Sequence, residues 1–275
     1  MPSYVITGVS RGLGWEFLDQ LSANADNIVI GIVRNKPAAD KRVAEELPGR
    51  TNITILEADI NDYDQLKKAA ADAATVTGGR LDHLIANAAH LTPLDAYDGI
   101  GTIAEQSPGE LAKEFRQMMD TNVLANIHLY SLFLPQIRAG DARYRKVVAV
   151  SSGVADNDWT DECEIEPACL NAMSKAALNV VTAKFHAQYG RREGILFLSV
   201  CPGLVDAGHF VEPTPPQQEK LNKLLASFAR YSSTFKGPDT PANAIRDVLS
   251  VIDSSSLEKG DGGRFLSHFG NKQWL

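Results

Sequence analysis

Three glycines near the start of the chain have the spacing of a phosphate-binding loop. Gly8, Gly12 and Gly14 follow a short β-branched apolar run and open an amphipathic stretch. Glycine at these positions permits a tight turn, a close approach of the backbone to a pyrophosphate, and close packing of helix on strand. The N–H groups and dipole at the helix start attract phosphate, so the pattern predicts a dinucleotide site. The loop residues predicted to line it are Gly8, Ser10, Arg11, Gly12, Leu13 and Gly14.

Two arginines bear on which dinucleotide this loop binds. Arg11 lies within the loop, and Arg34 ends the second predicted strand, where the sequence 33–36 has no carboxylate. A site for NAD usually has an acidic residue there, which binds the ribose hydroxyls. Guanidinium groups instead form charge-assisted bonds to a 2′-phosphate, although both arginines are also typical of a solvated surface. We therefore expect NADP(H) as the cofactor, with NADPH preferred over NADH.

Residues after the third and fourth predicted strands complete the expected cofactor site. Asp59 and Ile60 directly follow the third strand, where a side chain can contact the adenine edge. Asp59 is equally typical of a turn or of a helix cap before Tyr63. Asn87, Ala88 and Ala89 end the fourth strand, and their small size lets the backbone lie close to a cofactor.

The elements that position these residues alternate along the chain. Short β-branched apolar runs separated by longer amphipathic stretches predict a parallel sheet with helices on both faces. Predicted strands are Tyr4–Thr7, Asn27–Val33, Ile53–Glu57, His83–Ala86, Lys146–Val150, Leu196–Val200 and Gly263–Leu266. Predicted helices are Gly12–Leu21, Lys41–Leu47, Tyr63–Val76, Glu110–Leu134, Ala172–Tyr189, Gln217–Ala229 and Pro241–Val251. We expect an α/β fold of Rossmann type, doubly wound, in a single domain over residues 1–275.

Composition narrows the class of partner. The chain has 275 residues, a formal net charge of −7 and a pI near 5.4, which argues against a nucleic-acid or anionic-membrane surface. Its three cysteines do not have metal-ligand spacing, so we expect no metal and a reducing compartment. With no signal-like start and no apolar run near the ~20 residues of a membrane helix, we expect a cytoplasmic protein acting on a small molecule.

Two irregular stretches follow strand ends. Residues 156–168 are acidic, and residues 208–218 contain three prolines. The carboxyl ends of strands form the ligand-binding edge of an open α/β sheet, so both stretches are expected to be functional lids or solvated loops.

Taken together, these motifs resemble the short-chain dehydrogenase/reductase family, in particular a fungal carbonyl-reductase-like branch. The resemblance covers nearly the whole chain and rests on Thr-Gly-x-x-x-Gly-x-Gly, Asn-Ala-Ala, Ser-Lys-Ala-Ala-Leu-Asn, Pro-Gly and the final Phe-Leu-Ser-His-Phe-Gly-Asn-Lys-Gln-Trp-Leu. It implies a seven-stranded sheet and a catalytic Asn–Ser–Tyr–Lys set. Matched by motif, this set falls on Asn122, Ser152, Asn171 and Lys175, and the cofactor contacts also include Lys175, Pro202, Gly203 and Val205.

Asn171 is the main departure, because the family has a catalytic tyrosine at that position. There the tyrosine hydroxyl exchanges a proton with the substrate oxygen, while the lysine lowers its pKa and holds the nicotinamide ribose. An amide does not titrate in this range, so Asn171 can donate a hydrogen bond but no proton. Asn is also typical of a helix N-cap without a chemical role.

Four interpretations of this departure stay open. An NADPH-dependent reductase acting on an iminium carbon needs no acid, as in tyrosine-less fungal alkaloid reductases of the family that also template a cycloaddition. A carbonyl reductase needs a substitute acid. In the third interpretation the chain is a non-redox cyclase in which bound NADP has a structural role. In the fourth it is a catalytically inactive NADP-binding sensor. The possible substitute acids are Ser152, Lys175 through water, Asp156 and Asp158.

A few further residues have two interpretations each. His209 follows the Pro-Gly loop and faces either substrate or solvent, and Tyr97 is a possible surrogate phenol. Cys169 is expected to pack rather than react. The apolar stripe of residues 110–134 is typical of a homodimer or homotetramer interface in the family, and equally of core packing.

Overall fold

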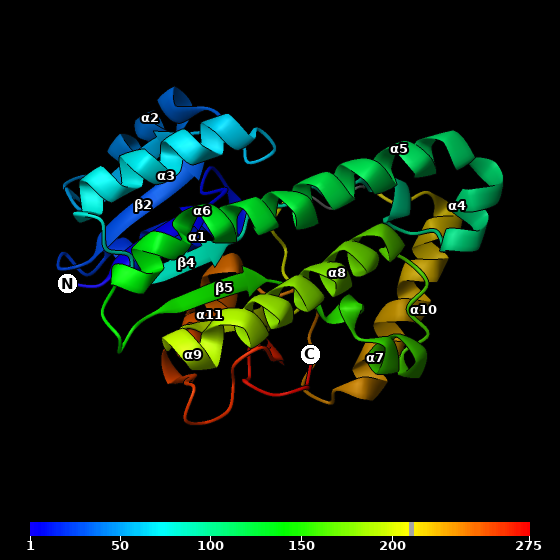
Figure 1. Cartoon of the computed structure of the whole chain (residues 1–275). Helices are drawn as coiled ribbons and strands as arrows, with labels where there is room; N and C mark the ends of the chain where they lie inside the picture. Colours follow the sequence, from blue (N-terminus) through cyan, green and yellow to red (C-terminus); the bar gives the residue numbers. More distant parts are fainter. Residues whose placement is uncertain (209–211) are drawn as a thin grey trace.

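A seven-stranded, all-parallel sheet forms the centre of the protein, in the order β3-β2-β1-β4-β5-β6-β7 (Figure 1). The computed structural model describes residues 1–208 and 212–275. The strands are β1 (Ser3–Thr7), β2 (Ile28–Val33), β3 (Ile53–Glu57), β4 (His83–Ala86), β5 (Lys146–Val150), β6 (Leu196–Cys201) and β7 (Phe265–Ser267). All seven predicted strands are confirmed, as is the Rossmann-type α/β fold.

Helices cover both faces of this sheet and bury two apolar clusters against it. One face is covered by α1 (Gly12–Ser22), α2 (Lys36–Glu46) and α11 (Pro241–Ser254). The other is covered by α3 (Tyr63–Thr77), α6 (Ala125–Ala139) and α8 (Cys169–Phe185), with α9 (Arg191–Glu193) beyond a π-helical turn. Since both faces are covered, the strands are apolar along nearly their whole length.

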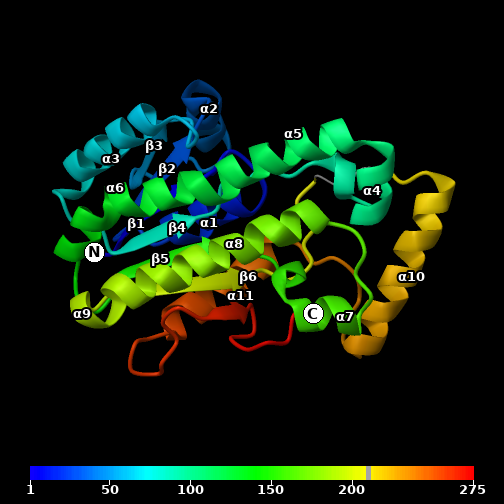
Figure 2. The same cartoon turned by 45° about the vertical axis from the view of Figure 1, so that its right-hand side comes forward.

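A third group of elements lies at the end of the sheet where the strands have their carboxyl ends, as Figure 2 shows. It comprises α4 (Ile100–Gln106), α5 (Pro108–Met119), α7 (Asn157–Glu162) and α10 (Pro215–Tyr231). A separate apolar cluster, which includes Trp159, Phe228 and Trp274, joins α7 and α10 to the C-terminal segment. These elements form the wall around the strand ends where ligands bind in this fold class.

The predicted helix ends differ from the observed ones where side chains cap the backbone. Helix α2 begins five residues before its predicted start, because the Asn35 side chain accepts a hydrogen bond from Ala38 N (3.0 Å). The predicted helix Glu110–Leu134 is two helices joined by a π-helical turn at Asp120–Leu124. Part of the acidic stretch 156–168 is helix α7, because Asp156 caps it.

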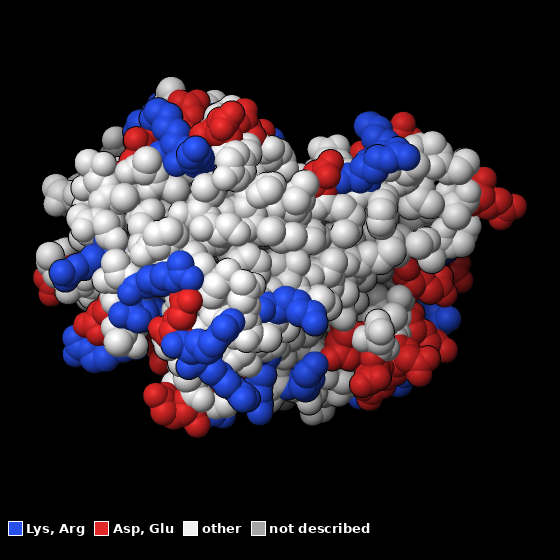
Figure 3. Space-filling view, in the orientation of Figure 1, with Lys and Arg blue, Asp and Glu red and all other residues white. Residues whose placement is uncertain are grey.

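An uncharged band crosses the face formed by α5, α6 and α8 (Figure 3). Phe115 on α5, Leu124 in the π-helical turn and Val180 on α8 are exposed, at 41%, 46% and 58%. The apolar stripe of residues 110–134 is thus partly on the surface and not wholly in the core, and a homodimer or homotetramer stays a prediction.

Of the helices in the described ranges, none combines the length and the apolar character that crossing a membrane requires.

Candidate active site

The glycine loop has the geometry that a phosphate cradle requires. Gly8 and Gly12 have φ of +77° and +57°, a region that favours glycine. A Cβ on Gly14 would lie 2.1 Å from Gly8 O, so helix α1 approaches the end of β1 more closely than any side chain allows. Arg11, at the N-cap of α1, is extended and makes no side-chain cap bond. The first N–H groups of α1 therefore lack a capping side chain and point at the loop, as an anion site needs.

Thr7 ties this loop to the end of β4. Its hydroxyl accepts hydrogen bonds from Asn87 N (3.1 Å) and Ala88 N (3.0 Å). Asn87 Nδ2 in turn donates to Thr7 O (2.9 Å). A Cβ on Gly8 would lie 2.9 Å from Ala88 Cα, which explains the need for small residues in both segments. The predicted loop residues and residues 87–89 are thus brought together, and the Asn87 side chain is engaged in a hydrogen bond to the backbone of β1.

The two arginines predicted for a 2′-phosphate lie on the surface beside the loop. Arg11 and Arg34 are both exposed, and neither forms an ion pair with any residue in the described ranges. A third arginine, Arg42, was not anticipated from the sequence. Its guanidinium lies 3.8 Å above the Trp15 ring and donates to Ser10 O (2.9 Å), while Glu46 pairs with it. Arg42 therefore supports the loop, and two unpaired cations stay available to an anion.

Asp59 and Ile60 follow β3 as predicted. Asp59 Oδ1 accepts from Asn61 N (2.9 Å), which fixes the turn. The cap of α3 is Asp62, whose side chain accepts from Asp64 N and Gln65 N. Of the two structural interpretations of Asp59, the turn is confirmed and the helix cap is wrong. Ile60 is partly buried against the cluster on the α3 face, as Leu13 is against the cluster on the α1 face.

Lys175 is buried at the end of β5. It is 6% exposed, and its Nζ donates to Val150 O (2.7 Å). Burial lowers the pKa of this ammonium to about 8, while the nearby Cys201 thiol opposes the shift. In the described part of the chain no carboxylate pairs with it. An ammonium of this kind is costly to bury and is correspondingly able to release its proton near neutral pH.

Ser152 lies on the loop directly after β5, beside the ends of β4 and β6. Its side chain is half-buried and makes no hydrogen bond to the described residues. The next residue, Gly153, donates from its N–H to Cys201 Sγ (3.0 Å), and Gly203 N donates to the same sulfur (3.3 Å). Burial raises the pKa of the Cys201 thiol to about 11, so it acts here as a neutral acceptor.

The segment after β6 runs from this point to the glycine loop. Gly203 has φ of +85°, and a Cβ there would lie 2.9 Å from His268 Cε1. Val205 is buried and forms a parallel bridge with Asp239. A Cβ on Gly12 would lie 3.4 Å from Ala207 Cβ. The predicted Pro202, Gly203 and Val205 therefore belong to the same loop cluster as the glycine loop.

Asn122 is fully buried within the π-helical turn, and its side chain forms hydrogen bonds with the backbone of a neighbouring segment. Its Oδ1 accepts from His90 N (2.7 Å), and its Nδ2 donates to His90 O (3.0 Å) and Ser174 Oγ (3.0 Å). Residue 90 follows the Asn-Ala-Ala segment, so Asn122 fixes the chain beyond β4 and joins it to α8. The His90 ring is 2.9 Å from Glu114 Oε2, a pair not anticipated from the sequence.

Asn171 lies one helical turn before Lys175 on α8, which places both side chains on the same side of the helix. Its Oδ1 is buried and has no hydrogen-bond partner in the described structure. It is not the helix cap: Asp95 Oδ2 accepts from Leu170 N (2.7 Å) and Asn171 N (3.3 Å). The cap interpretation of Asn171 is therefore wrong, and its amide oxygen has no partner among the described residues.

Asp95 is the functional residue that sequence reasoning missed most completely. It is 3% exposed, and burial raises the pKa of its carboxyl although the two helix N–H bonds oppose the shift. Asp95 O also accepts from Ala168 N (2.6 Å), which supports the positive φ of 59° at Ala168. Its only sequence signal is an acidic residue shortly after a strand end, which does not indicate a partner 75 residues away.

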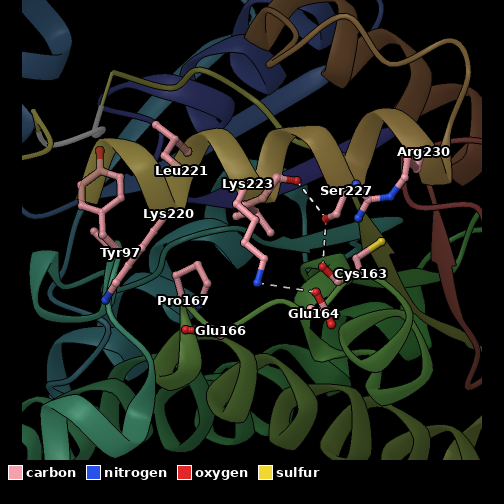
Figure 4. A pocket seen from close by; sticks show the side chains of 12 residues that line it. Tyr97, Cys163, Glu164, Glu166, Pro167, Lys220, Leu221, Lys223, Ser227 and Arg230 are labelled. Carbon is pink, nitrogen blue, oxygen red and sulfur yellow. Dashed lines mark hydrogen bonds and ion pairs between the residues drawn. The ribbon is translucent and has the colours of Figure 1, made fainter. Parts of the chain in front are cut away.

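The acidic stretch does not bring its carboxylates to Lys175. Asp156 caps α7 and pairs with Lys272 (3.1 Å), and Asp158 is exposed. Two other glutamates of the stretch, Glu164 and Glu166, line a pocket against α10 (Figure 4).

Three remaining predicted residues lie apart from the α8 pair. Tyr97 lines the same pocket against α10, whose lining includes neither Asn171 nor Lys175. Cys169 is half-buried, and burial raises the pKa of its thiol, in keeping with a packing role. His209 lies outside the described residues. Within those residues no group of three or more metal-binding side chains is found.

Known proteins match both the sequence and this architecture. Residues 3–218 match the family model described as short chain dehydrogenase. The short chain dehydrogenase virK of Hypocrea virens is 49% identical over 275 residues, with all of both chains covered. The short-chain dehydrogenase/reductase iacC of Pestalotiopsis fici is 44% identical over 276 residues, again with full coverage.

Solved structures have the same fold. The carbonyl reductase Sniffer of D. melanogaster superposes with a TM-score of 0.75 at 21% identity, covering 98% of each chain. An NADPH-bound carbonyl reductase from chicken fatty liver superposes with a TM-score of 0.72 at 23% identity and equal coverage.

Removing the Asp95 carboxylate should destabilise the start of α8. Asp95→Ala leaves two helix N–H groups without an acceptor, so we expect a loss of about 1–3 kcal/mol in the free energy of unfolding. Asp95→Asn keeps one acceptor oxygen and should lose less. Urea unfolding measures both, and equal stability of Asp95→Ala and the unsubstituted protein would contradict this role.

The buried ammonium of Lys175 should give the protein a pH-dependent stability. Its folded-state pKa of about 8 is below the unfolded value of 10.5, so its contribution to stability rises as pH increases from 8 to 10.5. Lys175→Met should therefore be more stable than the unsubstituted protein below pH 8, by up to ~3 kcal/mol. This gain should shrink by pH 10.5. Urea unfolding across pH 6–10.5 tests it, and a pH-independent difference would refute the shift.

Proposed function

The chain belongs to the short-chain dehydrogenase/reductase family, and we propose that it is an NADPH-dependent reductase acting on an iminium or carbonyl carbon. The substrate is a small molecule of secondary-metabolite type. Fungal relatives named as short-chain dehydrogenases cover the full chain, and a structural neighbour is an NADPH-bound carbonyl reductase, which support the reductase class. The observation that carries the finer proposal is the buried, unpartnered amide oxygen of Asn171, one helical turn before Lys175 on α8.

The residues present fit NADPH. The positive φ of Gly8 and Gly12 and the close approach at Gly14 leave room for a pyrophosphate at the uncapped start of α1. Arg11 and Arg34 supply two unpaired positive charges for a 2′-phosphate. When bound, NADPH supplies the hydride. The other residues proposed to hold it are Asp59, Ile60, Asn87, Ala88, Ala89, Lys175, Pro202, Gly203 and Val205.

Asn171 favours a substrate that brings its own positive charge. Its buried Oδ1 is a hydrogen-bond acceptor with no partner, which suits an N–H of the substrate better than a carbonyl oxygen. An iminium carbon that accepts hydride becomes a neutral amine without a proton from the protein. Asn171 then orients and electrostatically stabilises the cation, and no acid is needed.

Reduction of a carbonyl would need a proton from elsewhere in the site. Asp156 is engaged as a helix cap and ion-pair partner, and Asp158 is exposed, so neither acidic residue serves. Ser152 and Lys175 are the remaining donors. With a pKa of about 8, Lys175 can pass a proton through Ser152 or a water molecule near neutral pH.

Arg34→Ala should weaken NADPH binding and spare NADH. Loss of a charge-assisted bond to a phosphate typically costs about 1.5–3 kcal/mol, so the Kd for NADPH should rise about 10- to 100-fold. The Kd for NADH should stay within about twofold. Fluorescence titration measures both, with Lys41→Ala on α2 as a control that also removes one exposed positive charge. Equal weakening of the two cofactors would rule out a 2′-phosphate contact at Arg34.

Asn171→Tyr should confer activity on neutral ketones. A phenol at this position supplies the missing acid, and proton transfer of this kind contributes about 10²–10⁴-fold to the rate. We therefore expect kcat/KM for ketones to rise at least ~10²-fold. Asn171→Phe, which adds the ring without the hydroxyl, is the matched control. If the two variants reduce ketones equally, the missing proton donor is not what limits this site.

A further inference from the structure

The C-terminal segment folds back onto the loop that carries Ser152. After β7, Ser267 N donates to Asn271 O (2.8 Å), which closes a turn. The turn directs the last residues to the carboxyl ends of the strands, and the C-terminus lies beside α7 in Figure 2. There Trp274 is 2% exposed, and its ring stacks on Phe265 with centroids 4.4 Å apart.

Trp274 packs directly against the residue that follows Ser152. A Cβ on Gly153 would lie 3.1 Å from Trp274 Cβ and 2.9 Å from Trp159 Cζ3, so the Gly153 backbone is held between two tryptophans. Cys201 Sγ, which accepts from Gly153 N, belongs to the same apolar cluster. Because interiors are close-packed, truncating Trp274 would leave a cavity against this backbone.

Polar contacts tie the same segment to both sides of the site. Lys272 pairs with Asp156 (3.1 Å), and Asp156 N donates to Gly153 O (2.9 Å). On the other side, Trp274 N donates to the hydroxyl of Tyr231, at the end of α10 (3.3 Å). The C-terminal segment thus joins the Ser152 loop to α10.

We propose that Trp274 is a positioning residue for catalysis: it holds residues 153–156 and thereby sets the position of the Ser152 hydroxyl. This inference rests on the proposed reductase function, in which Ser152 faces the substrate. A displacement of about 1 Å in a catalytic group can cost about 10²-fold in rate. The glycine loop joins β1 to α1, and Arg34 directly follows β2, so the binding of the cofactor phosphates should not depend on this contact.

The test compares Trp274→Ala and Trp274→Phe in the full-length protein. Hydrogen exchange of the amides of residues 153–156 should be at least ~10-fold faster in Trp274→Ala, since local opening governs exchange. Its kcat should fall by ~10-fold or more while the Kd for NADPH stays within about twofold. Trp274→Phe, which keeps an aromatic ring, should restore both properties. Lys272→Ala, which removes the ion pair with Asp156 and the cation–π contacts with Phe265 and Trp274 but leaves both rings in place, should speed the same exchange by a smaller factor.

Two controls separate positioning from general stability. Phe269→Ala alters an exposed side chain of the same segment, and Leu66→Ala destabilises the core beneath α3. If exchange at residues 153–156 in Trp274→Ala is no faster than in Leu66→Ala, or if kcat and NADPH affinity fall together, the proposal is overturned. If the unsubstituted protein oxidises no NADPH, the reductase function fails, and the exchange data still decide whether Trp274 holds the loop.

Discussion

The arrangement of the site depends on the pairing of one buried carboxylate with the start of α8. The first N–H groups of a helix have no acceptor within the helix, and a buried one without a partner is costly. Asp95 Oδ2 accepts from Leu170 N and Asn171 N, and its backbone carbonyl holds Ala168 in a positive-φ conformation. Because a helix is rigid once begun, this pairing sets the position of every later residue on α8, Lys175 included.

The parallel sheet supplies the other half of that geometry. Adjacent parallel strands end at one edge, so the ends of β1, β4, β5 and β6 lie together there. Lys175 reaches this edge through its hydrogen bond to Val150 O. The neighbouring Ser174 accepts a hydrogen bond from Asn122, which also holds the chain beyond β4. The site therefore holds an ammonium of lowered pKa next to an amide that does not titrate. In the function that we propose, this pair holds the ribose and orients the substrate, and proton delivery falls to Lys175 or is not required.

The sequence predicted what local patterns determine. The strands and the turn at the glycine loop were predicted correctly, because each depends on periodicity or spacing within one segment. The structure brings the motif-matched Ser152 and Lys175 to the end of β5, and their catalytic roles stay a prediction. Contacts between distant segments were not predictable in this way. Asp95 acts on a helix that begins more than 70 residues later, and Trp274 contacts Gly153 from the far end of the chain. Asp156 was predicted as a substitute acid, yet its position before α7 makes it a cap, which only the fold shows.

The measurement that tests the central claim most directly is NADPH oxidation by the unsubstituted protein with two sets of substrates, neutral ketones and preformed cyclic iminium ions. NADH serves as the control cofactor. A site that holds NADPH and offers an amide in place of a phenol should turn over the iminium ions with NADPH and reduce the ketones far more slowly. Rapid reduction of ketones with no preference for iminium ions would contradict this account of Asn171.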